Sequence, residues 1–471
     1  MTASPPHLPE VGDLLELSVG EAVHGGWCVA RTDPAPAGPA SSAGPARAAA
    51  AAPSAAAHPR PVIFVRHALP GERVRVVITQ ATSKFARADA VQILNASADR
   101  VQPPCPHARP GGCGGCDWQH ASLPAQRALK AAIVRQQLRR IAGLERDLTV
   151  EPVPGDEAGL GWRTRVKFAV GRDGVAGLRR HRSHDVMEIG DCPIAHPLVT
   201  AARATGRIWP GAASVEVAAV PGSGQRAVVV TGAMPVLDGG GVPGVAADTV
   251  LSGKAGSSRR TVARGPGYLR QRAAGRDWRV SAAGFWQVHP GAADTLATAV
   301  LGALRPRPGD VALDLYCGAG LFAGVLAEAV GPRGAVIGIE ADAAAVRDAR
   351  HNLRVTPWAR VHRGDVAAVL ARNGLSGASL AVLDPPRTGV ARPVIDLLSA
   401  PSSAGGAPRT DRARRAGQVG RIAYVSCDPA TLARDIAVLA AAGWELEELR
   451  AFDAFPMTHH VECLATLSRG S

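Results

Sequence analysis

Aromatic residues and lysine are scarce in this chain of 471 residues. Phe, Trp and Tyr together make up 4% of it. Lysine occurs only as Lys84, Lys130, Lys167 and Lys254, so arginine carries nearly all of the positive charge. With abundant Ala, Gly and Pro, this composition is typical of a GC-rich genome. The net charge of +13 nevertheless favours a polyanionic partner, RNA or DNA rather than a membrane.

Long apolar runs are also missing. No run reaches the roughly 18 residues that cross a bilayer, and the N-terminus "MTASPPHLPE" has neither the basic segment nor the apolar segment of a secretion signal. Eight cysteines in a chain of this length do not form the disulfide framework of a small secreted protein. We therefore expect a cytoplasmic protein of about three domains, and the sequence indicates no obligate protein partner.

Residues 9–101 alternate apolar and polar positions between Pro-Gly turns. This pattern predicts a small OB-like β-barrel, with a low-complexity insertion at 34–60. Basic strands on such a barrel fit an RNA-binding module, although a purely structural barrel fits the pattern nearly as well.

Residues 102–284 read as a central, mainly β domain with a cluster of cysteines. An amphipathic helix is expected at 122–144, where it can pack on the C-terminal domain. Four cysteines have spacings typical of a metal site: Cys105, Cys113, Cys116 and Cys192. Four thiolates suit tetrahedral zinc or a [4Fe–4S] cluster, and spacing alone does not choose between them.

From residue 285 to 471 short β patterns alternate with helical patterns. The predicted strands are "VALDLY", "AVIGIE", "ARVHRGD", "LAVLDPP" and "RIAYVSCD". Such alternation predicts an α/β domain with a doubly wound, Rossmann-like and mainly parallel sheet. Two final β stretches would close the sheet as an antiparallel pair, and residues 402–420 form a second polar insertion.

The stretch "DLYCGAGLFA" follows the first of these strands and opens a helix. Gly318, Gly320 and Ala323 fit a glycine-rich cofactor loop, and Glu340 ends the next strand, where a carboxylate can bind ribose hydroxyls. Taken alone, these residues allow NAD or S-adenosylmethionine. Asp314, four residues before the first glycine, favours S-adenosylmethionine.

Two further residues end strands of the same sheet. Asp384 of "LDPPRTGV" and Cys427 of "YVSCDPATLARDI" should both face the crevice at the carboxyl ends of the strands. Asp428 and Pro429 can begin a helix directly after Cys427. A helix N-terminus stabilises a thiolate, whereas the charge of Asp428 opposes it.

These motifs, with "FWQVHP" and "DAFPMTHHVECLATL", resemble the RNA uracil-5-methyltransferase family. The N-terminal β segment resembles the TRAM domain that many members carry. "CPHARPGGCGGCDWQH" with "GDCPI" resembles the iron–sulfur site of one branch, although the first gap between cysteines is longer here. The resemblance implies a [4Fe–4S] cluster, and RNA, either rRNA or tRNA, as the partner.

The resemblance also implies roles for single residues. Cys427 would be the nucleophile that adds to carbon 6 of uracil, and Glu462 the base that removes the carbon 5 proton. S-adenosylmethionine would be bound by Gln287, Tyr316, Gly318, Gly320, Glu340, Asp365 and Asp384. Leu321 and Asp428 stand where many members carry Asn.

Other functions stay open at this point. An RNA cytosine-5 methyltransferase typically uses an additional cysteine in the Pro-Pro region, which "LDPPRTGV" does not have. An NAD-linked oxidoreductase leaves Cys427 and Asp384 without a role. A non-catalytic RNA-binding protein would retain the fold without needing Cys427 or Glu462.

Overall fold

The computed structural model describes residues 9–32, 62–232, 245–254, 256, 259–375, 377–400 and 418–469. The expected insertion at 34–60 and residues 402–417 of the second insertion lie outside this part of the chain. The chain divides into two compact units, 1–112 with 116–125, and 113–115 with 126–471.

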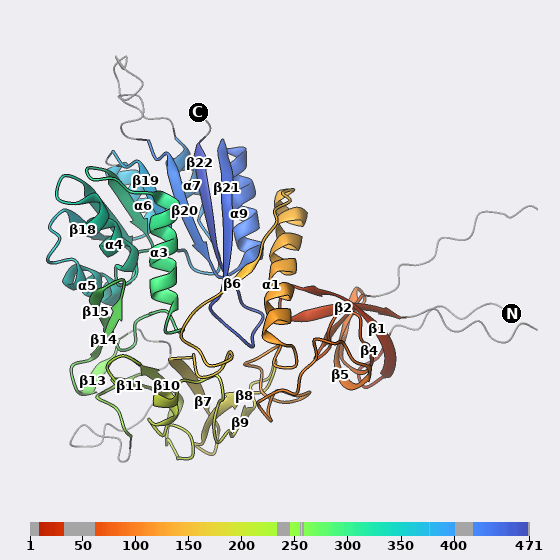
Figure 1. The fold of residues 1–471 in the computed structure, drawn as a ribbon. Coiled ribbons are helices and arrows are strands. Elements are labelled where there is room, and N and C mark those ends of the chain that lie inside the picture. Colours follow the sequence, from red (N-terminus) through yellow and green to blue (C-terminus); the bar gives the residue numbers. More distant parts are fainter. Residues whose placement is uncertain are drawn as a thin grey trace, which may run out of the picture. The chain divides into compact units, whose positions relative to one another are not determined.

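The first unit contains a closed five-stranded β-barrel, as the alternating pattern predicted (Figure 1). Its strands follow the order β1-β2-β3-β5-β4, and alternate side chains such as Ile63, Val65, Val74 and Val76 fill the interior at 0% exposure. The strands are β1 (Leu14–Val23), β2 (Trp27–Thr32), β3 (Val62–Arg66), β4 (Arg73–Ala81) and β5 (Phe85–Asn95).

The second unit contains a seven-stranded sheet in the order β13-β12-β11-β10-β7-β8-β9. Its core contains Phe168, Trp209, Val217 and Val228. The strands are β7 (Arg165–Val170), β8 (Ala176–Arg179), β9 (Val186–Met187), β10 (Ala212–Ala219), β11 (Arg226–Gly232), β12 (Thr249–Gly253) and β13 (Thr261–Arg264), with helix α2 (Pro197–Thr200) between β9 and β10. A separate hairpin follows, of β14 (Tyr268–Ala273) and β15 (Arg276–Ser281).

The C-terminal part of this unit is an eight-stranded sheet in the order β18-β17-β16-β19-β20-β22-β21-β6. The first five strands in this order, β18, β17, β16, β19 and β20, run parallel. β22 pairs antiparallel with both β20 and β21. The strands are β16 (Val311–Leu315), β17 (Ala335–Glu340), β18 (Ala359–Arg363), β19 (Leu380–Leu383), β20 (Arg421–Ser426), β21 (Trp444–Asp453), β22 (Glu462–Arg469) and β6 (Val150–Pro152). The expected Rossmann-like sheet is confirmed, but β6, from far upstream, was not predicted.

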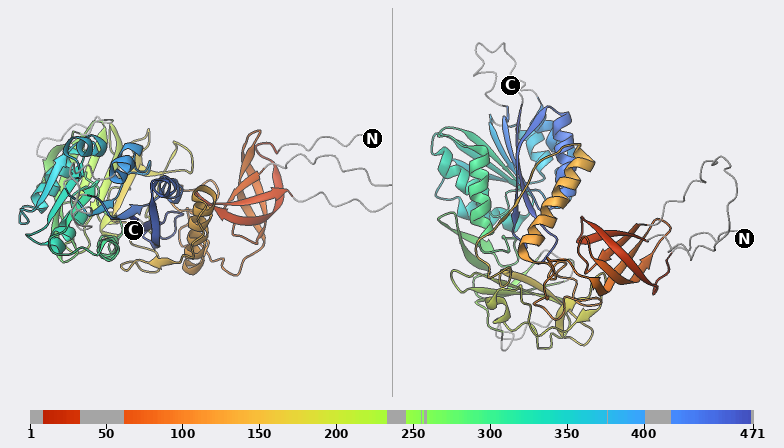
Figure 2. Two further views of the ribbon diagram at one scale, coloured as in Figure 1. Left: turned by 90° about the horizontal axis from the view of Figure 1, so that it is seen from above. Right: turned by 45° about the vertical axis from the view of Figure 1, so that its right-hand side comes forward.

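Helices cover both faces of this sheet (Figures 1 and 2). One face packs on α3 (Ala292–Leu304), α4 (Leu321–Val330) and α5 (Ala343–Asn352). The other packs on α6 (Val366–Asn373), α7 (Arg392–Ser399) and α9 (Pro429–Ala441), with α1 (Leu123–Gln137) and the π-helical turn η1 (Leu138–Ala142). None of the helices in the described ranges is long and apolar enough to cross a membrane.

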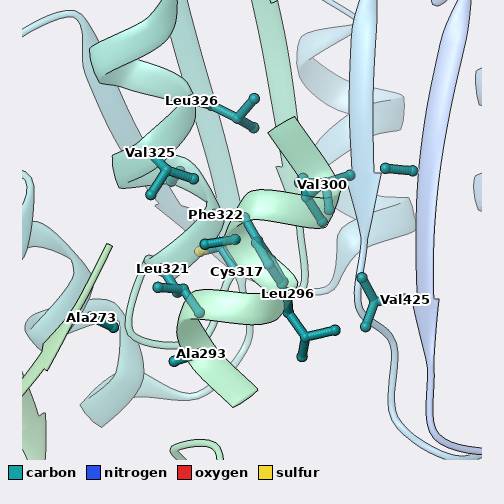
Figure 3. Close-up of a cluster of buried hydrophobic side chains, with 14 of the residues drawn as sticks. Ala273, Ala293, Leu296, Val300, Cys317, Leu321, Phe322, Val325, Leu326 and Val425 are labelled. Carbon is teal, nitrogen blue, oxygen red and sulfur yellow. The ribbon is translucent and has the colours of Figure 1, made fainter. Parts of the chain in front are cut away.

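Alternation along the strands divides the core into two layers. Ala423 and Val425 of β20 belong to the cluster under α3 and α4, whereas Ile422 and Tyr424 belong to the cluster under α9. Figure 3 shows the first cluster, which includes Leu296 of α3, Phe322 of α4 and Cys317, the residue between β16 and α4 that precedes Gly318. A strand buried on both faces reads as a continuous apolar run, which explains "RIAYVS".

Helix α1 holds the segment between β21 and β22. Lys130 is fully buried, and its ammonium group donates to Asp453 Oδ1 at 2.5 Å and to the Phe455 carbonyl at 2.9 Å. Gln126 Oε1 accepts from the Met457 amide at 2.7 Å, and Met457 has a φ of +67°. Because Glu462 follows this segment, α1 fixes the chain that leads to it.

We predict that Lys130→Met lowers the free energy of unfolding by roughly 3 to 5 kcal/mol, because it leaves the Asp453 carboxylate buried without its cation. Urea titration measures this loss. The double variant Lys130→Met/Asp453→Leu should recover most of the stability, since an apolar pair needs no compensating charge. A single variant as stable as the parent chain would contradict this account of the α1 contact.

Candidate active site

The glycine-rich loop connects β16 to α4 in a turn that needs left-handed backbone. Tyr316, Gly318 and Gly320 have φ values of +67°, +53° and +91°. A side chain at Gly320 would be strained at this φ and would lie 3.3 Å from Ala349 Cβ. The turn opens α4 at Leu321, so the free amide groups of the helix N-terminus follow the loop directly.

Glu340 ends β17 beside this loop, at the position where the sequence placed it. Its Oε2 accepts from the Gly318 amide at 3.0 Å, and its Oε1 accepts from the Asp342 amide at 2.7 Å. The carboxylate therefore fixes the first glycine of the loop while it stands at the carboxyl end of its strand, where ligands bind in open α/β sheets.

Asp314, on β16 below the loop, is fully buried. Its Oδ2 accepts from the Ala323 amide at 2.6 Å, and its Oδ1 has no hydrogen-bond partner among the described residues. Burial raises the pKa of Asp314 to about 8, and the carboxylates of Asp384 and Glu340 add to this effect. An unsatisfied buried oxygen at this depth fits a loop that is completed by a ligand with hydrogen-bond donors.

The other expected cofactor residues lie at different places around the sheet. Burial raises the pKa of Tyr316 to about 12, and its side chain hydrogen-bonds with the Ala391 backbone. Asp365 caps α6, where its Oδ1 accepts from the Ala368 amide at 3.0 Å. Gln287 is half-buried in the connection between β15 and α3. The structure therefore groups Glu340 with the glycine loop, and gives Asp365 a capping role.

Strand order brings three distant acidic or nucleophilic residues to one edge of the sheet. Asp384 follows β19 and Cys427 follows β20, and these two strands are parallel neighbours. β22 runs antiparallel to β20, with Cys463 opposite Ser426. Glu462, the first residue of β22, therefore lies next to the end of β20 where Cys427 stands.

The sequence left the size of the pKa shift of Cys427 open, and groups from other strands determine it. Burial, the largest cause, and the carboxylates of Glu462 and Asp384 together raise the pKa of Cys427 to about 11. The Arg387 side chain hydrogen-bonds with Cys427 and lowers its pKa, but does not cancel the rise. Stabilisation of the thiolate by the start of α9 is thus outweighed by burial and by two carboxylates.

Two carboxyl groups share this desolvated space. Glu462 is only 4% exposed, and burial with the Asp384 charge raises its pKa well above the usual range. Asp384 is half-buried, and desolvation raises its pKa to about 7. Arg387 lowers the pKa of both Cys427 and Glu462 but does not cancel these rises, so the site favours protonated forms before any ligand arrives.

Arg387 is the residue of this site that the sequence reasoning missed. It follows Asp384 and the two prolines, and its carbonyl accepts from the Thr431 hydroxyl at 3.0 Å. Asp435 of α9 holds the same loop, because its Oδ2 accepts from the Val390 amide at 2.8 Å and from the Tyr424 hydroxyl at 2.6 Å. A basic residue directly after an acidic-Pro-Pro motif at a strand end is the signal that could have identified Arg387.

Asp428 caps α9. Its Oδ1 accepts from the Thr431 amide at 2.8 Å, and Pro429 occupies the first turn of the helix. The cap fixes where the helix begins, and therefore the position of the preceding Cys427.

The four clustered cysteines are not arranged as a metal site in the described residues. There, no group of three or more His, Cys, Asp or Glu side chains could hold a metal ion. Cys113 and Cys192 belong to the second unit. Burial is the main cause of the raised pKa of Cys192, and the nearby Cys113 raises it further. Cys105 and Cys116 belong to the first unit.

Three family models match separate parts of the chain. Residues 377–470 match tRNA (Uracil-5-)-methyltransferase, residues 290–373 match Protein-L-isoaspartate(D-aspartate) O-methyltransferase, and residues 10–91 match the TRAM domain. The first match contains Asp384, Cys427 and Glu462, and the second contains the glycine-rich loop.

Two curated relatives are similar over almost the whole chain. An uncharacterized RNA methyltransferase of Streptomyces avermitilis is 45% identical, over 97% of this chain and 98% of the relative. One of Streptomyces coelicolor is 47% identical, over 97% of this chain and 93% of the relative.

A solved structure shares the fold. It is Pyrococcus abyssi tRNA (uracil-54, C5)-methyltransferase in complex with S-adenosyl-L-homocysteine. It matches with a TM-score of 0.63 and 23% identity, over 86% of this chain and 94% of that one.

The pKa directions predict opposite effects of two substitutions on the reactivity of Cys427. With a pKa of about 11, the group is mainly a thiol at pH 8 and should react slowly with iodoacetamide. Glu462→Gln removes a charge that raises this pKa, so modification should be faster and its pH midpoint lower. Arg387→Met removes the group that lowers it, so modification should be slower.

Mass spectrometry of the Cys427 peptide across a pH series measures both effects. The peptide of Cys28, a barrel thiol whose pKa burial raises to about 12, is the internal reference and should respond to neither substitution. Shifts of the same sign in both variants would contradict the assigned electrostatics.

Proposed function

The chain belongs to the RNA methyltransferase family of these relatives, and we propose that it transfers a methyl group from S-adenosylmethionine to carbon 5 of a uridine in RNA. The observation that carries this proposal is the convergence of Cys427, Asp384 and Glu462 at one sheet edge, in the same sheet as the glycine loop. A nucleophile and a separate base beside a methyl-donor loop are the groups that this reaction requires.

S-adenosylmethionine, when bound, supplies an electrophilic methyl group on a positively charged sulfonium. Glu340 stands at the end of β17 with a carboxylate that can accept from ribose hydroxyls, and the loop from Tyr316 to Gly320 precedes the amide groups of α4. We assign cofactor binding to Gln287, Tyr316, Gly318, Gly320, Glu340 and Asp384, with Asp365 as a further candidate. Asp384 carries a carboxyl group whose raised pKa would fall toward its usual range beside a cation.

Cys427 acts first on the base. Its thiolate adds to carbon 6 of uracil, and the electrons of the 5,6 double bond become an enolate. Carbon 5 of the enolate then takes the methyl group, and the sulfonium leaves as a neutral thioether. Arg387 supports the thiolate through its hydrogen bond and its charge.

Glu462 completes the reaction. It removes the proton from carbon 5, the electrons of that bond restore the double bond, and the Cys427 sulfur leaves carbon 6. Burial raises the pKa of Glu462, which makes its carboxylate a stronger base for a carbon-bound proton. Glu462 must be ionised when it removes the proton. Its raised pKa opposes the ionised state, and the charge of Arg387 favours it.

The RNA that carries the uridine is the next question. The matching family model and the Pyrococcus abyssi structure both name tRNA in their descriptions. We therefore propose tRNA as the first substrate to test and rRNA as the second.

The covalent mechanism predicts a trapped intermediate. Glu462→Gln should accumulate a protein–RNA adduct that survives denaturation and contains the transferred methyl group, because the carbon 5 proton is no longer removed. Cys427→Ala should form no adduct, because no nucleophile remains. Denaturing gels with RNA and cofactor labelled in the methyl group measure both.

RNA that contains 5-fluorouridine is the control for the parent chain, which it should trap in the same way, since fluorine does not leave as a proton does. Equal adduct in Cys427→Ala would exclude this cysteine as the nucleophile. Methyl transfer to cytidine, or none to any RNA, would contradict the proposed function.

We also propose that Cys105, Cys113, Cys116 and Cys192 bind a [4Fe–4S] cluster, with zinc as the alternative. The spacing of the four cysteines and the proximity of Cys113 to Cys192 support this, although the described residues do not group all four. The cluster would lie outside the reacting groups, so no step of methyl transfer is assigned to it.

Metal analysis tests the cluster. Protein purified without oxygen should be brown and contain about four iron atoms per chain, and Cys113→Ser should lose the colour and most of the iron. Cys28→Ser, a substitution in the barrel, is the matched control and should keep both. Colourless protein with one zinc ion per chain would mean that the site binds zinc and not an iron–sulfur cluster. Protein without bound metal would contradict the proposed site.

A further inference from the structure

The positive charge of the chain lies almost entirely outside the barrel. Residues 1–101 contain nine basic and eight acidic side chains, a net +1, so +12 of the net +13 arises from residues 102–471. The five arginines of the barrel strands are therefore nearly balanced by the acidic residues of this segment as a whole. Attraction to phosphates, which dominates non-specific RNA binding, has little source in this barrel.

The barrel instead carries a group of aromatic side chains on its outer surface. Alternation along β3 and β5 buries Ile63, Val65, Ala86 and Ala88 in the barrel. Phe64, Phe85 and Arg87, which alternate with them along the strands, point outward and are half-buried. With one residue of β2 they form what we call the stacking patch: Trp27, Phe64, Phe85 and Arg87.

Backbone pairing places the members of the stacking patch side by side. Phe64 of β3 is opposite Arg87 of β5. The Phe64 and Phe85 ring centroids are 5.8 Å apart with an angle of 70° between the rings. The Arg87 guanidinium lies 4.8 Å from the Phe85 ring centroid and 5.5 Å from that of Trp27.

Arg87 is fixed in this position. Its Nη1 donates to Gln80 Oε1 at 2.5 Å, from the neighbouring strand β4. Rings and guanidinium therefore form one pre-organised, partly exposed π surface. A second guanidinium, that of the buried Arg66, lies 5.9 Å from the Trp27 ring centroid. The barrel interior is filled by aliphatic side chains and does not require these rings for its core.

We propose that the stacking patch binds the bases of single-stranded RNA. Base faces are accessible in single strands, and their stacking on aromatic side chains and arginine contributes binding free energy that depends little on sequence. Such binding suits a barrel whose charges nearly balance. That the nucleic acid is RNA rests on the proposed function.

Binding of the full-length chain to fluorescein-labelled single-stranded oligouridine tests the proposal, with fluorescence anisotropy at several salt concentrations. The variant Trp27→Leu/Phe64→Leu keeps most of the apolar area but removes the flat rings. Its dissociation constant should rise about tenfold or more. The slope of log affinity against log salt should not change, because no phosphate contact is lost.

Two matched measurements separate stacking from other contacts. An abasic ribose-phosphate oligomer of the same length should bind the parent protein more weakly than oligouridine does. Its affinity should be the same for the parent and for the Trp27→Leu/Phe64→Leu variant. Leu14→Ala, at an apolar side chain of β1 that is 64% exposed, should leave oligouridine affinity unchanged. Thermal unfolding should show that both variants remain folded.

Unchanged oligouridine affinity in a folded Trp27→Leu/Phe64→Leu variant would overturn the proposal, and would leave the patch as a protein contact or a stabiliser of the barrel. A reduced salt slope would also overturn it, since the loss would then be electrostatic. The variant should still form the 5-fluorouridine adduct at saturating RNA, because the patch supplies no reacting group. If the parent protein forms no 5-fluorouridine adduct, the proposed function is contradicted, whereas the oligouridine measurement still tests the stacking patch.

Discussion

The insertion of β22 between β20 and β21 is the constraint on which the candidate site depends. A purely parallel sheet would bring together only residues that end strands. Because β22 runs antiparallel to β20, its first residue stands at the same edge as the last residues of β19 and β20. Glu462 thereby reaches Cys427 from the opposite chain direction, and backbone hydrogen bonds rather than side-chain contacts set their spacing. The segment before Glu462 is in turn held by Gln126 and Lys130 of α1.

Desolvation is the second physical condition of the site. Asp314, Asp384, Cys427 and Glu462 all have pKa values raised by burial, and the Asp384 carboxylate raises those of the other three further. In the free chain this arrangement disfavours the thiolate that the proposed reaction needs. A positively charged ligand at this edge would reverse the balance, since an opposite charge favours every ionised form at once. Such coupling would keep Cys427 unreactive until the methyl donor is bound, and protect the thiol from side reactions.

Local patterns were sufficient for much of the fold. The β pattern of "AVIGIE" matches β17, and "RIAYVSCD" ends in the Cys427 turn, because a strand buried on both faces leaves a continuous apolar run in the sequence. Positive φ at Gly320 and the Asp428 cap are likewise encoded by neighbouring residues. β6 was not predicted, because three residues join β21 through long-range pairing that no local period reports.

Sequence position alone could not fix the electrostatics of the site. It placed Cys427 before a helix but left the size of its pKa shift open, because the pKa of a buried group depends on everything packed around it, including Glu462 from another strand. Arg387 was missed for the same reason, since its contact with Cys427 crosses from the loop after β19 to the end of β20. The barrel segment, residues 1–101, carries only +1 of the net charge of +13, although its strands contain five arginines. Aromatic residues are only 4% of the chain, so three rings grouped on one outer surface are a more specific feature than its arginine content. Charge would then bring RNA to the rest of the chain, and the barrel would hold it by its bases.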